Sequence, residues 1–199
     1  MSSTEAPSVS KSALRAAALA RRAALGSDQR AAAEQAIAVR ARAVLSVLKP
    51  QVVAGYMPIR SECDPGAILE RARASGMAIA LPAVVDRERI LFRIHEAGEL
   101  LVPGGFGTLA PGPGAAIADP DLLLVPLVGF DRNGNRLGYG RGYYDRAIAA
   151  ARAGGKRAPL VGLAFSVQEV EAIPAESHDI RLDWVVTEKE TLEFRSKLA

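Results

Sequence analysis

The chain has 199 residues, of which 49% are hydrophobic and 24% are charged, with a formal net charge of +3. Disordered chains combine few apolar residues with a large charge imbalance, so this composition excludes that class and predicts a protein with a full core. The single cysteine, Cys63, excludes an intrachain disulfide framework, and no cluster of cysteine and histidine has the spacing of a zinc site.

The sequence also predicts the domain organisation and the location of the protein. Residues 1–10 are polar and lack the apolar stretch of a secretory signal, and we expect them to be disordered. Residues 11–199 are expected to form one domain, because domains run to about 100–200 residues. The longest strongly apolar run, Leu122–Phe130, is far shorter than the roughly 20 residues that cross a bilayer. We therefore expect a cytoplasmic protein without a membrane partner.

Two alanine-rich segments, 11–25 and 27–48, begin the predicted domain, and their composition favours helix. Gly26 stands where a C-cap glycine would end the first helix. Ser27 or Asp28 is expected to cap the start of the second helix. The sequence thus predicts a chain that begins with two N-terminal helices.

Shorter elements follow these helices. The β-branched run 52–56 predicts a strand. Asp64 is expected as the N-cap of a helix over 65–74, in which proline takes the first position. Segments 77–85 and 89–95 have the apolar and β-branched composition of two further strands.

The second half of the chain indicates the fold class. Segment 101–120 is dense in glycine and proline and is expected to be mostly loop. Segment 121–130 is almost continuously apolar, which is typical of a strand buried on both faces in a parallel sheet. A helix over 143–153 and strands over 160–165 and 183–187 follow. This alternation predicts a three-layer α/β fold, with a mostly parallel sheet flanked by helices.

Charge is distributed unevenly along the chain. Segments 11–42 and 132–157 each hold seven basic residues, against two and one acidic residues respectively, whereas 168–193 holds eight acidic and two basic residues. Two basic segments and one acidic segment suit an anionic ligand with a counter-ion or metal nearby. The alternative is a solvated surface on which arginine is simply the preferred basic residue.

The most informative stretch joins the predicted strand at 121–130 to the helix at 143–153. Gly138, Gly140 and Gly142 occupy alternate positions there, and Arg136 and Arg141 stand among them. Small residues let backbone N–H groups approach phosphate oxygens, a helix start adds partial positive charge, and arginine adds forked donors. The spacing matches neither a Walker A loop nor a dinucleotide fingerprint. A plain connection is the alternative to this predicted phosphate cradle.

The run 129–146, which contains GNRLGYGRGYYDR, resembles the signature of the 5-formyltetrahydrofolate cyclo-ligase family. Weaker motifs agree with it in order and spacing: K-x-x-L-R at 11–15, a strand end with a glutamate at 57–64, an aromatic-bearing loop at 103–107 and a C-terminal signature at 176–187. The resemblance covers about residues 10–190 and implies a Rossmann-like or NagB-like fold.

The resemblance implies an enzyme that converts 5-formyltetrahydrofolate to 5,10-methenyltetrahydrofolate, with ATP as co-substrate and Mg²⁺ as cofactor. The formyl oxygen attacks the γ-phosphate, N10 adds to the activated carbon, and phosphate leaves. An amide oxygen needs no strong general base in this role, so the protein mainly aligns groups and neutralises phosphoryl charge.

The resemblance also implies roles for individual residues. The implied catalytic residues are Lys11, Arg141 and Tyr143. The implied ATP-binding residues are Lys11, Ser12, Ala13, Leu14, Arg15, Arg136, Leu137, Gly138, Tyr139, Gly140, Arg141, Gly142, Tyr143 and Tyr144. The implied substrate-binding residues are Met57, Glu62, Phe106, Tyr139 and Tyr143, and the implied metal ligands are Asp145 and Asp179.

Several of these residues have a simpler interpretation. Lys11 and Arg15 share a helical face, where both can reach one polyphosphate or merely decorate an exposed helix start. Glu62 either accepts N–H groups of the pterin or caps a helix. Asp145 is a metal ligand or a helix-start residue that the dipole favours. Tyr144 is expected to belong to the core. Cys63, His95 and His178 are given no catalytic role.

Two alternative functions remain open at this stage. A basic RNA-binding or regulatory module of the same fold would explain the basic segments, but the chain lacks the aromatic interleaving and repeated basic patches of nucleic-acid binders. An ATP-dependent ligase for another formamide-bearing substrate would use the same site. We therefore expect small-molecule partners, 5-formyltetrahydrofolate and ATP, and no nucleic acid.

Overall fold

The computed structural model describes residues 10–86, 89–105, 107–176 and 179–194. The predicted disordered N-terminus lies outside these ranges except for Ser10, whose hydroxyl accepts a hydrogen bond from the Ala13 amide and so caps the first helix. None of the helices in the described ranges is long and apolar enough to cross a membrane.

An eight-stranded sheet forms the centre of the described structure. Its parallel strands stand in the order β11 (Trp184–Val186), β10 (Leu160–Leu163), β7 (Leu122–Pro126), β1 (Val52–Ala54) and β2 (Ala78–Val84). The antiparallel strands are β12 (Thr191–Glu193) beside β11, and β3 (Ile90–Ile94) and β6 (Ile117–Ala118) beyond β2. The predicted mostly parallel α/β sheet is therefore confirmed.

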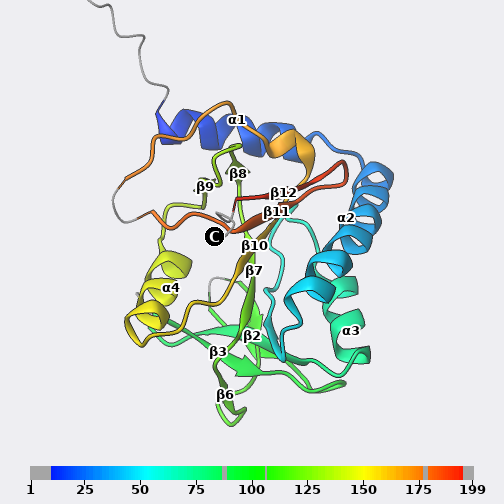
Figure 1. Ribbon diagram of the computed structural model, residues 1–199, viewed down its shortest axis with the longest axis vertical. Coiled ribbons are helices and arrows are strands. Elements are labelled where there is room, and N and C mark those ends of the chain that lie inside the picture. The colour runs from blue at the N-terminus through cyan, green and yellow to red at the C-terminus, as the bar shows by residue number, and fades with distance from the viewer. Residues whose placement is uncertain (1–9, 87–88, 106, 177–178, 195–199) are drawn as a thin grey trace, which may run out of the picture.

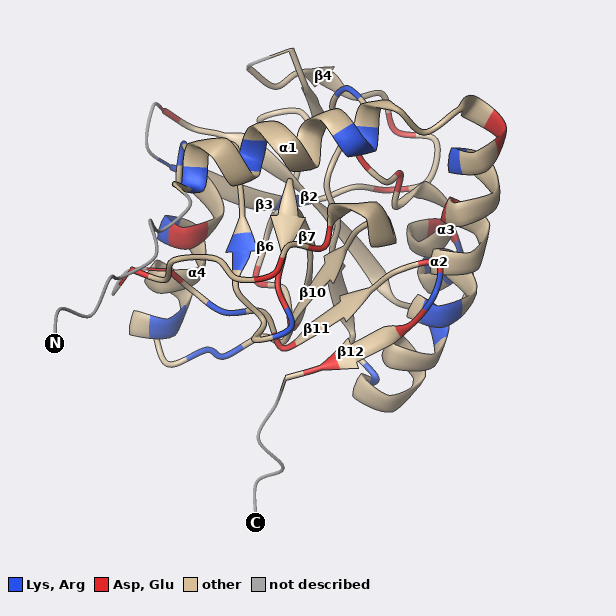
Figure 2. Ribbon diagram, turned by 90° about the horizontal axis from the view of Figure 1, so that it is seen from above, with Lys and Arg blue, Asp and Glu red and all other residues tan. Residues whose placement is uncertain are grey.

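Helices cover both faces of this sheet, and one lies across its end. Figure 1 shows α2 (Ser27–Leu48) and α3 (Gly66–Ala74) on one face and α4 (Tyr143–Ala153) on the other. Viewed from above, α1 (Lys11–Ala23) crosses over the end of the sheet, as Figure 2 shows. A short 3-10 helix, η1 (Ser166–Gln168), packs beneath α1. The layers match the predicted architecture.

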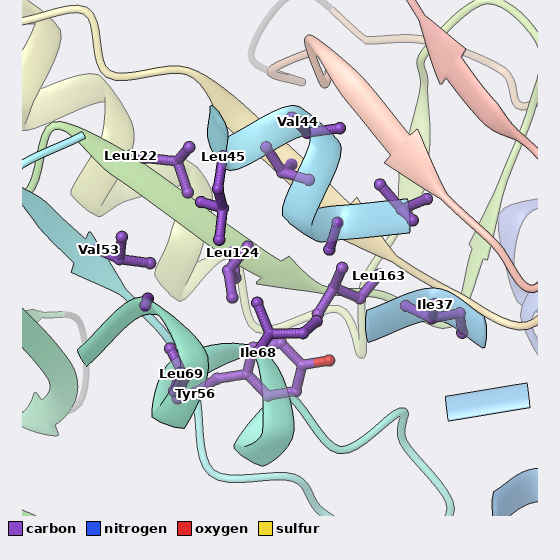
Figure 3. Close-up of a cluster of buried hydrophobic side chains, with 14 of the residues drawn as sticks. Ile37, Val44, Leu45, Val53, Tyr56, Ile68, Leu69, Leu122, Leu124 and Leu163 are labelled. Atoms are coloured by element: carbon purple, nitrogen blue, oxygen red, sulfur yellow. The ribbon is translucent and has the colours of Figure 1, made fainter. Parts of the chain in front are cut away.

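Strand β7 is buried from both sides, as its apolar run predicts. Leu122 and Leu124 belong to the cluster on the α2 and α3 face, whereas Leu123 and Val125 belong to the cluster on the α4 face. Alternate residues of a strand point to opposite faces, so a continuous apolar run is required here. Figure 3 shows the first cluster, with helix residues packed over β1 and β7. Pro126 ends the strand earlier than the run 121–130 indicated.

The helix ends differ in detail from the prediction. Gly26 is not the C-cap of α1 but the N-cap of α2, because its amide donates to the Gln29 Oε1 atom at 3.2 Å. Ser27 and Asp28, which were expected to cap α2, therefore lie in its first turn. Asp64 does accept from the Gly66 amide, at 2.7 Å, but Pro65 takes the cap position.

Short strands also appear where loop was predicted. The segment 101–120 contains β4 (Val102–Pro103), β5 (Leu109–Ala110) and β6. After β7 the chain forms a hairpin from β8 (Gly129–Phe130) and β9 (Arg136–Leu137), which the sequence indicated only as a turn. Two-residue strands carry too few residues for an alternating pattern to be visible in the sequence.

The order of the parallel strands locates the ligand-binding end of the sheet. The chain moves from β1 outward to β2 on one side, and later from β7 outward to β10 and β11 on the other. The strand order therefore reverses between β1 and β7. Open α/β sheets bind ligands at such a switch point, outside the carboxyl ends of the strands. The loops that follow β1 and β7 are therefore the first place to look for a site.

Candidate active site

A cleft of about 1120 Å³ opens at this end of the sheet. Its walls come from the start of α1, the loop after β1, the ends of β2 and β7, the segment 136–142 and the first turns of α4. A smaller hollow of about 490 Å³ lies at the opposite end, between the turns that precede β1 and β2, and Lys49 is the one charged residue that lines it. The larger cleft is therefore the candidate site.

The β8–β9 hairpin presents the glycine-rich loop 138–142 to the cleft. Asp131 is fully buried in the hairpin turn, and its carboxylate accepts hydrogen bonds from the backbone of Asn133 and Asn135, at 2.9 and 3.0 Å. It also accepts from the Ile173 amide at 2.9 Å, which ties the turn to the segment after η1. Gly134 has a φ of 81°, a turn conformation that favours glycine.

Two glycines of the loop adopt backbone conformations that other residues avoid. Gly140 has a φ of 89° and Gly142 a φ of 64°. A side chain at Gly142 would also meet Arg146 at 2.9 Å. A Cβ atom at Gly138 would have no other atom of the described structure within 4 Å, so the backbone there is open to a ligand. The loop backbone is therefore accessible from the cleft at Gly138, and two of its turns depend on glycine.

The start of α1 lies beside this loop. The Arg15 Nε atom donates to the Gly138 carbonyl at 2.7 Å, and the Lys11 ammonium lies 2.7 Å from carboxylate oxygens of both Glu176 and Asp179. Burial lowers the pKa of Lys11, but the hydrogen bonds to these two carboxylates outweigh it and leave the pKa raised. Lys11 thus stays a cation at the cleft wall.

Arg136, a predicted ATP-binding residue, lines the cleft and has carboxylate and carbonyl partners there. Its side chain is only 6% exposed, and Nη2 lies 2.6 Å from the Asp145 Oδ1 atom. It also donates to the Ile180 carbonyl. Burial lowers the pKa of Arg136, while the charges of Asp145 and Asp179 oppose that shift. Arg136 is therefore held by the charges of the two carboxylates that were predicted as metal ligands.

Glu62 is a buried carboxylate that also lines the cleft. Its Oε2 atom accepts from the Ile59 amide at 2.9 Å within the loop after β1. Burial raises the pKa of Glu62, and the Ile59 amide, Arg22 and Tyr139 partly offset that rise. Because Asp64 serves the start of α3, helix capping does not explain Glu62.

Aromatic residues complete the cleft. Tyr143 lies under the Arg146 guanidinium, with Cζ 5.1 Å from the ring centroid. Tyr144 packs edge-on against Phe92 at 6.4 Å, which agrees with its expected core role, although Tyr144 also lines the cleft. Its hydroxyl is buried without a hydrogen-bond partner among the described residues.

The structure brings most of the predicted site residues together. Met57, Arg141 and Leu137 line the cleft, as do the glycines of the loop. Three predicted ATP-binding residues do not line it: Ser12 and Ala13 are exposed on α1, and Leu14 packs against the apolar residues beneath that helix. The predicted substrate residue Phe106 lies outside the described residues. Burial raises the pKa of Cys63, which keeps its thiol protonated.

Two residues of this region were missed by sequence reasoning. Arg22 is fully buried at the end of α1 and donates to the Tyr139 hydroxyl at 2.7 Å. The Arg60 guanidinium carbon lies 5.7 Å from the Tyr139 ring centroid. Arg22 follows Lys11, Arg15 and Ala18 at helical spacing, so all four lie on one face of α1. The sequence alone carried no signal for the burial of Arg22, because the burial of Ala18 on the same face is known only from the structure.

Comparison with known proteins shows the family to which this chain is similar. The model of the 5-formyltetrahydrofolate cyclo-ligase family matches residues 7–188. The 5-formyltetrahydrofolate cyclo-ligase of Mycolicibacterium smegmatis is 32% identical over 90% of this chain and 94% of its own length. The Escherichia coli K12 enzyme of the same name is 31% identical, over 87% of this chain and 98% of its own.

Solved structures lead to the same conclusion. The NMR structure of Aquifex aeolicus 5,10-methenyltetrahydrofolate synthetase is 30% identical, covers 95% of each chain and has a TM-score of 0.79. The Mycoplasma pneumoniae 5,10-methenyltetrahydrofolate synthetase has a TM-score of 0.74 at 26% identity, over 90% of this chain and 99% of that one. The family match, the relatives and the shared fold together show that this chain belongs to the 5-formyltetrahydrofolate cyclo-ligase family.

Proposed function

We propose that this chain cyclises 5-formyltetrahydrofolate to 5,10-methenyltetrahydrofolate and converts ATP to ADP and phosphate in the same reaction. One observation carries the proposal: a single cleft is lined both by a buried carboxylate, Glu62, and by a glycine loop with cationic side chains around it. The two linings suit the two substrates, a pterin with N–H donors and a nucleotide with a polyphosphate. Membership of the family supports the same assignment.

The nucleotide is expected to bind along the glycine loop. The backbone of Gly138 is open to the cleft, and α4 begins beside it at Tyr143. The backbone N–H groups at a helix start favour the binding of an anion. Arg15, Lys11 and Arg141 place cationic side chains around the same space. Backbone donors and positive charge together stabilise phosphate oxygens.

The folate is expected to bind against the loop after β1. Glu62 offers carboxylate oxygens to the amino and ring N–H groups of the pterin, and Met57 supplies an apolar surface in the same loop. Tyr139 of the glycine loop and Tyr143 at the start of α4 line the same cleft, in which the formyl group must meet the nucleotide.

The reaction then proceeds by phosphoryl transfer followed by ring closure. The formyl oxygen forms a bond to the γ-phosphorus while the bond to the β-phosphate oxygen breaks, and ADP leaves. The folate N10 next attacks the activated carbon, loses its proton, and the carbon–oxygen bond breaks to release phosphate. Lys11, Arg141 and Tyr143 are proposed to align these groups and to stabilise charge on the transferred phosphoryl group.

Mg²⁺ fits this cleft only together with a nucleotide. Among residues 10–86, 89–105, 107–176 and 179–194, no group of three or more His, Cys, Asp or Glu side chains is placed to hold a metal ion. Mg²⁺ usually needs only one or two carboxylates besides substrate phosphates and water. Asp145 and Asp179, which both act on Arg136, are the proposed carboxylates. The ion would supply positive charge at the phosphates.

The test is the absorbance of methenyltetrahydrofolate formed from 5-formyltetrahydrofolate, with and without MgATP. We expect product only when both substrates are present, with one ADP released for each product molecule. Product without ATP, or ATP hydrolysis without product, would refute the proposal. Tight RNA binding in the absence of any turnover would instead support the binding-module alternative. Turnover of other formamides but not of 5-formyltetrahydrofolate would support the alternative ligase.

A further inference from the structure

Arg22 is a fully buried cation that the proposed reaction does not use directly. It stands in the last turn of α1, where the helix end carries partial negative charge. Its Nε atom donates to the Ser61 hydroxyl at 3.1 Å, Nη1 to the Leu127 carbonyl at 3.3 Å, and Nη2 to the Tyr139 hydroxyl at 2.7 Å. One guanidinium therefore joins α1 to the loops after β1 and β7 and to the glycine loop.

The partners of Arg22 are all neutral oxygens. No carboxylate among the described residues forms a direct ion pair with it. Burying a charge without a counter-ion is costly, so a negative group nearby is expected. Glu62 is that group, since it directly follows Ser61, to which Arg22 donates at 3.1 Å, and the charge of Arg22 lowers the pKa of Glu62. A buried cation and a buried carboxylate thus act on each other beside Tyr139.

We propose that Arg22 is a positioning residue that fixes Tyr139 beside the Glu62 loop and favours the ionised form of Glu62. This inference rests on the proposed function only in the role it gives to Glu62. The Tyr139 hydroxyl accepts from Arg22 and keeps its own proton, which it can direct toward Glu62. Arg22, Tyr139 and Glu62 then form a chain from the end of α1 to the folate wall of the cleft.

Several other titratable groups also act on Glu62. Arg60, on the same loop, lowers the pKa of Glu62 with its charge, as Arg22 and Tyr139 do. Tyr56 at the end of β1, Cys63 beside Glu62 and Tyr144 on α4 also interact with it, but burial raises the pKa of each of these three groups. These three groups are therefore neutral at physiological pH. Arg22 and Arg60 are the cations that offset the rise in the pKa of Glu62 caused by its burial.

The test compares Arg22→Met, Arg22→Lys and Tyr139→Phe with Arg21→Met as a matched control. Arg21 occupies the same helical turn, but it is exposed and donates to the carbonyls of Val167 and Glu169, at 2.6 and 3.0 Å, away from Glu62. The first readout is the NMR chemical shift of the Glu62 carboxyl carbon, followed against pH in the ligand-free protein. The signal is assigned to Glu62 because it disappears in Glu62→Gln. The second is the pH dependence of KM for 5-formyltetrahydrofolate.

Arg22→Met should raise the midpoint of the Glu62 NMR titration by about one pH unit. That is the low end of the pKa shift that a nearby opposite charge produces. As the pH is lowered, the KM for 5-formyltetrahydrofolate should begin to rise about one pH unit earlier in Arg22→Met than in wild type. In alkaline buffer the KM of the variant should return toward the wild-type value, and kcat should change less than KM. Arg22→Lys should restore the midpoint, and Arg21→Met should leave it in place. A merely structural role would instead change KM by the same factor at every pH.

An unmoved midpoint in Arg22→Met, or an equal movement in Arg21→Met, would overturn the inference. If Arg22→Met does not fold, Tyr139→Phe decides, because losing the hydroxyl should raise the midpoint while Arg22 stays in place. No movement in that variant would again overturn it. The NMR titration needs no substrate, so it tests the role of Arg22 even if the wild-type protein shows no turnover. Absence of turnover would refute the proposed function alone.

Discussion

Replacing Glu62 by glutamine should weaken folate binding while it stabilises the fold. The side chain is buried, and one carboxylate oxygen holds the Ile59 amide at 2.9 Å. Glutamine keeps an oxygen for that amide but places an NH₂ group where the second carboxylate oxygen stood. The pterin would then meet a donor in place of a charged acceptor. A hydrogen bond to a charged group is worth about 1.5–3 kcal/mol, which corresponds to a roughly 10- to 150-fold loss of folate affinity.

The pKa of Glu62 gives the sign of the effect on stability. Burial raises this pKa in the folded protein, so folding favours the protonated carboxyl group. Wild-type stability is therefore highest below the pKa of the unfolded chain and is partly lost as pH rises through the folded pKa. Glu62→Gln should have the higher Tm at neutral pH, and the difference from wild type should shrink in acid.

Binding and thermal unfolding test both halves of this prediction. Calorimetric titration with 5-formyltetrahydrofolate and with ATP should show the loss for folate alone. Thermal unfolding across the pH range should show the pH-dependent difference in Tm. Equal losses for folate and ATP would refute the folate-wall assignment of Glu62, and a lower Tm at neutral pH would refute the argument from burial.

Three further changes test the glycine loop and the core. Gly140→Val forces a branched residue to a φ of 89° in the loop, and turnover should fall by more than tenfold while circular dichroism shows a retained fold. Arg141→Ala removes a charged contact, and the KM for ATP should rise by roughly tenfold or more; an unchanged KM would show that Arg141 does not bind phosphate. Leu124→Ala empties a site that is 1% exposed on β7 and should cost about 2–5 kcal/mol in urea unfolding, with little effect on KM.

The sequence predicted those parts of the molecule that depend on local pattern. The apolar run through Leu124 indicated a central parallel strand because both of its faces are buried, and alternating glycines marked the loop at 138–142. Strand β12 was not predicted, because Thr191–Glu193 is a short edge strand with exposed ends and no apolar alternation. Local pattern specifies an element only when that element is long or buried enough to require it.

The parts that the sequence could not predict depend on contacts between distant segments. Arg136 lines the cleft, but spacing along the chain did not indicate its ion pair with Asp145 or its contact with the Ile180 carbonyl. Arg22 is surrounded in sequence by alanine and arginine, as an exposed helix end would be, and only the loop that brings Tyr139 to it reveals its burial. Which charges meet in the cleft is therefore set by the fold and not by spacing along the chain.

The contacts of Lys11 lead to a last prediction, in which two neighbouring carboxylates should behave differently. Glu176 and Asp179 both hold the Lys11 ammonium at 2.7 Å, so either carboxylate competes with a phosphate for this cation. Partly exposed ion pairs are worth about 0.2–1 kcal/mol, so releasing Lys11 should tighten the binding of metal-free ATP by up to about fivefold. Glu176→Gln and Asp179→Asn should share this effect, measured by titration with ATP and EDTA.

Mg²⁺ should then separate the two variants, because only Asp179 is proposed as a metal ligand. Adding Mg²⁺ should improve ATP binding in Glu176→Gln by the same factor as in wild type, and by a smaller factor in Asp179→Asn. The deficit should be partial, since water can replace one oxygen ligand of Mg²⁺. Equal responses to Mg²⁺ in both variants would remove Asp179 from the proposed metal site and leave it with one role, that of an anionic partner which holds Lys11 until phosphate arrives.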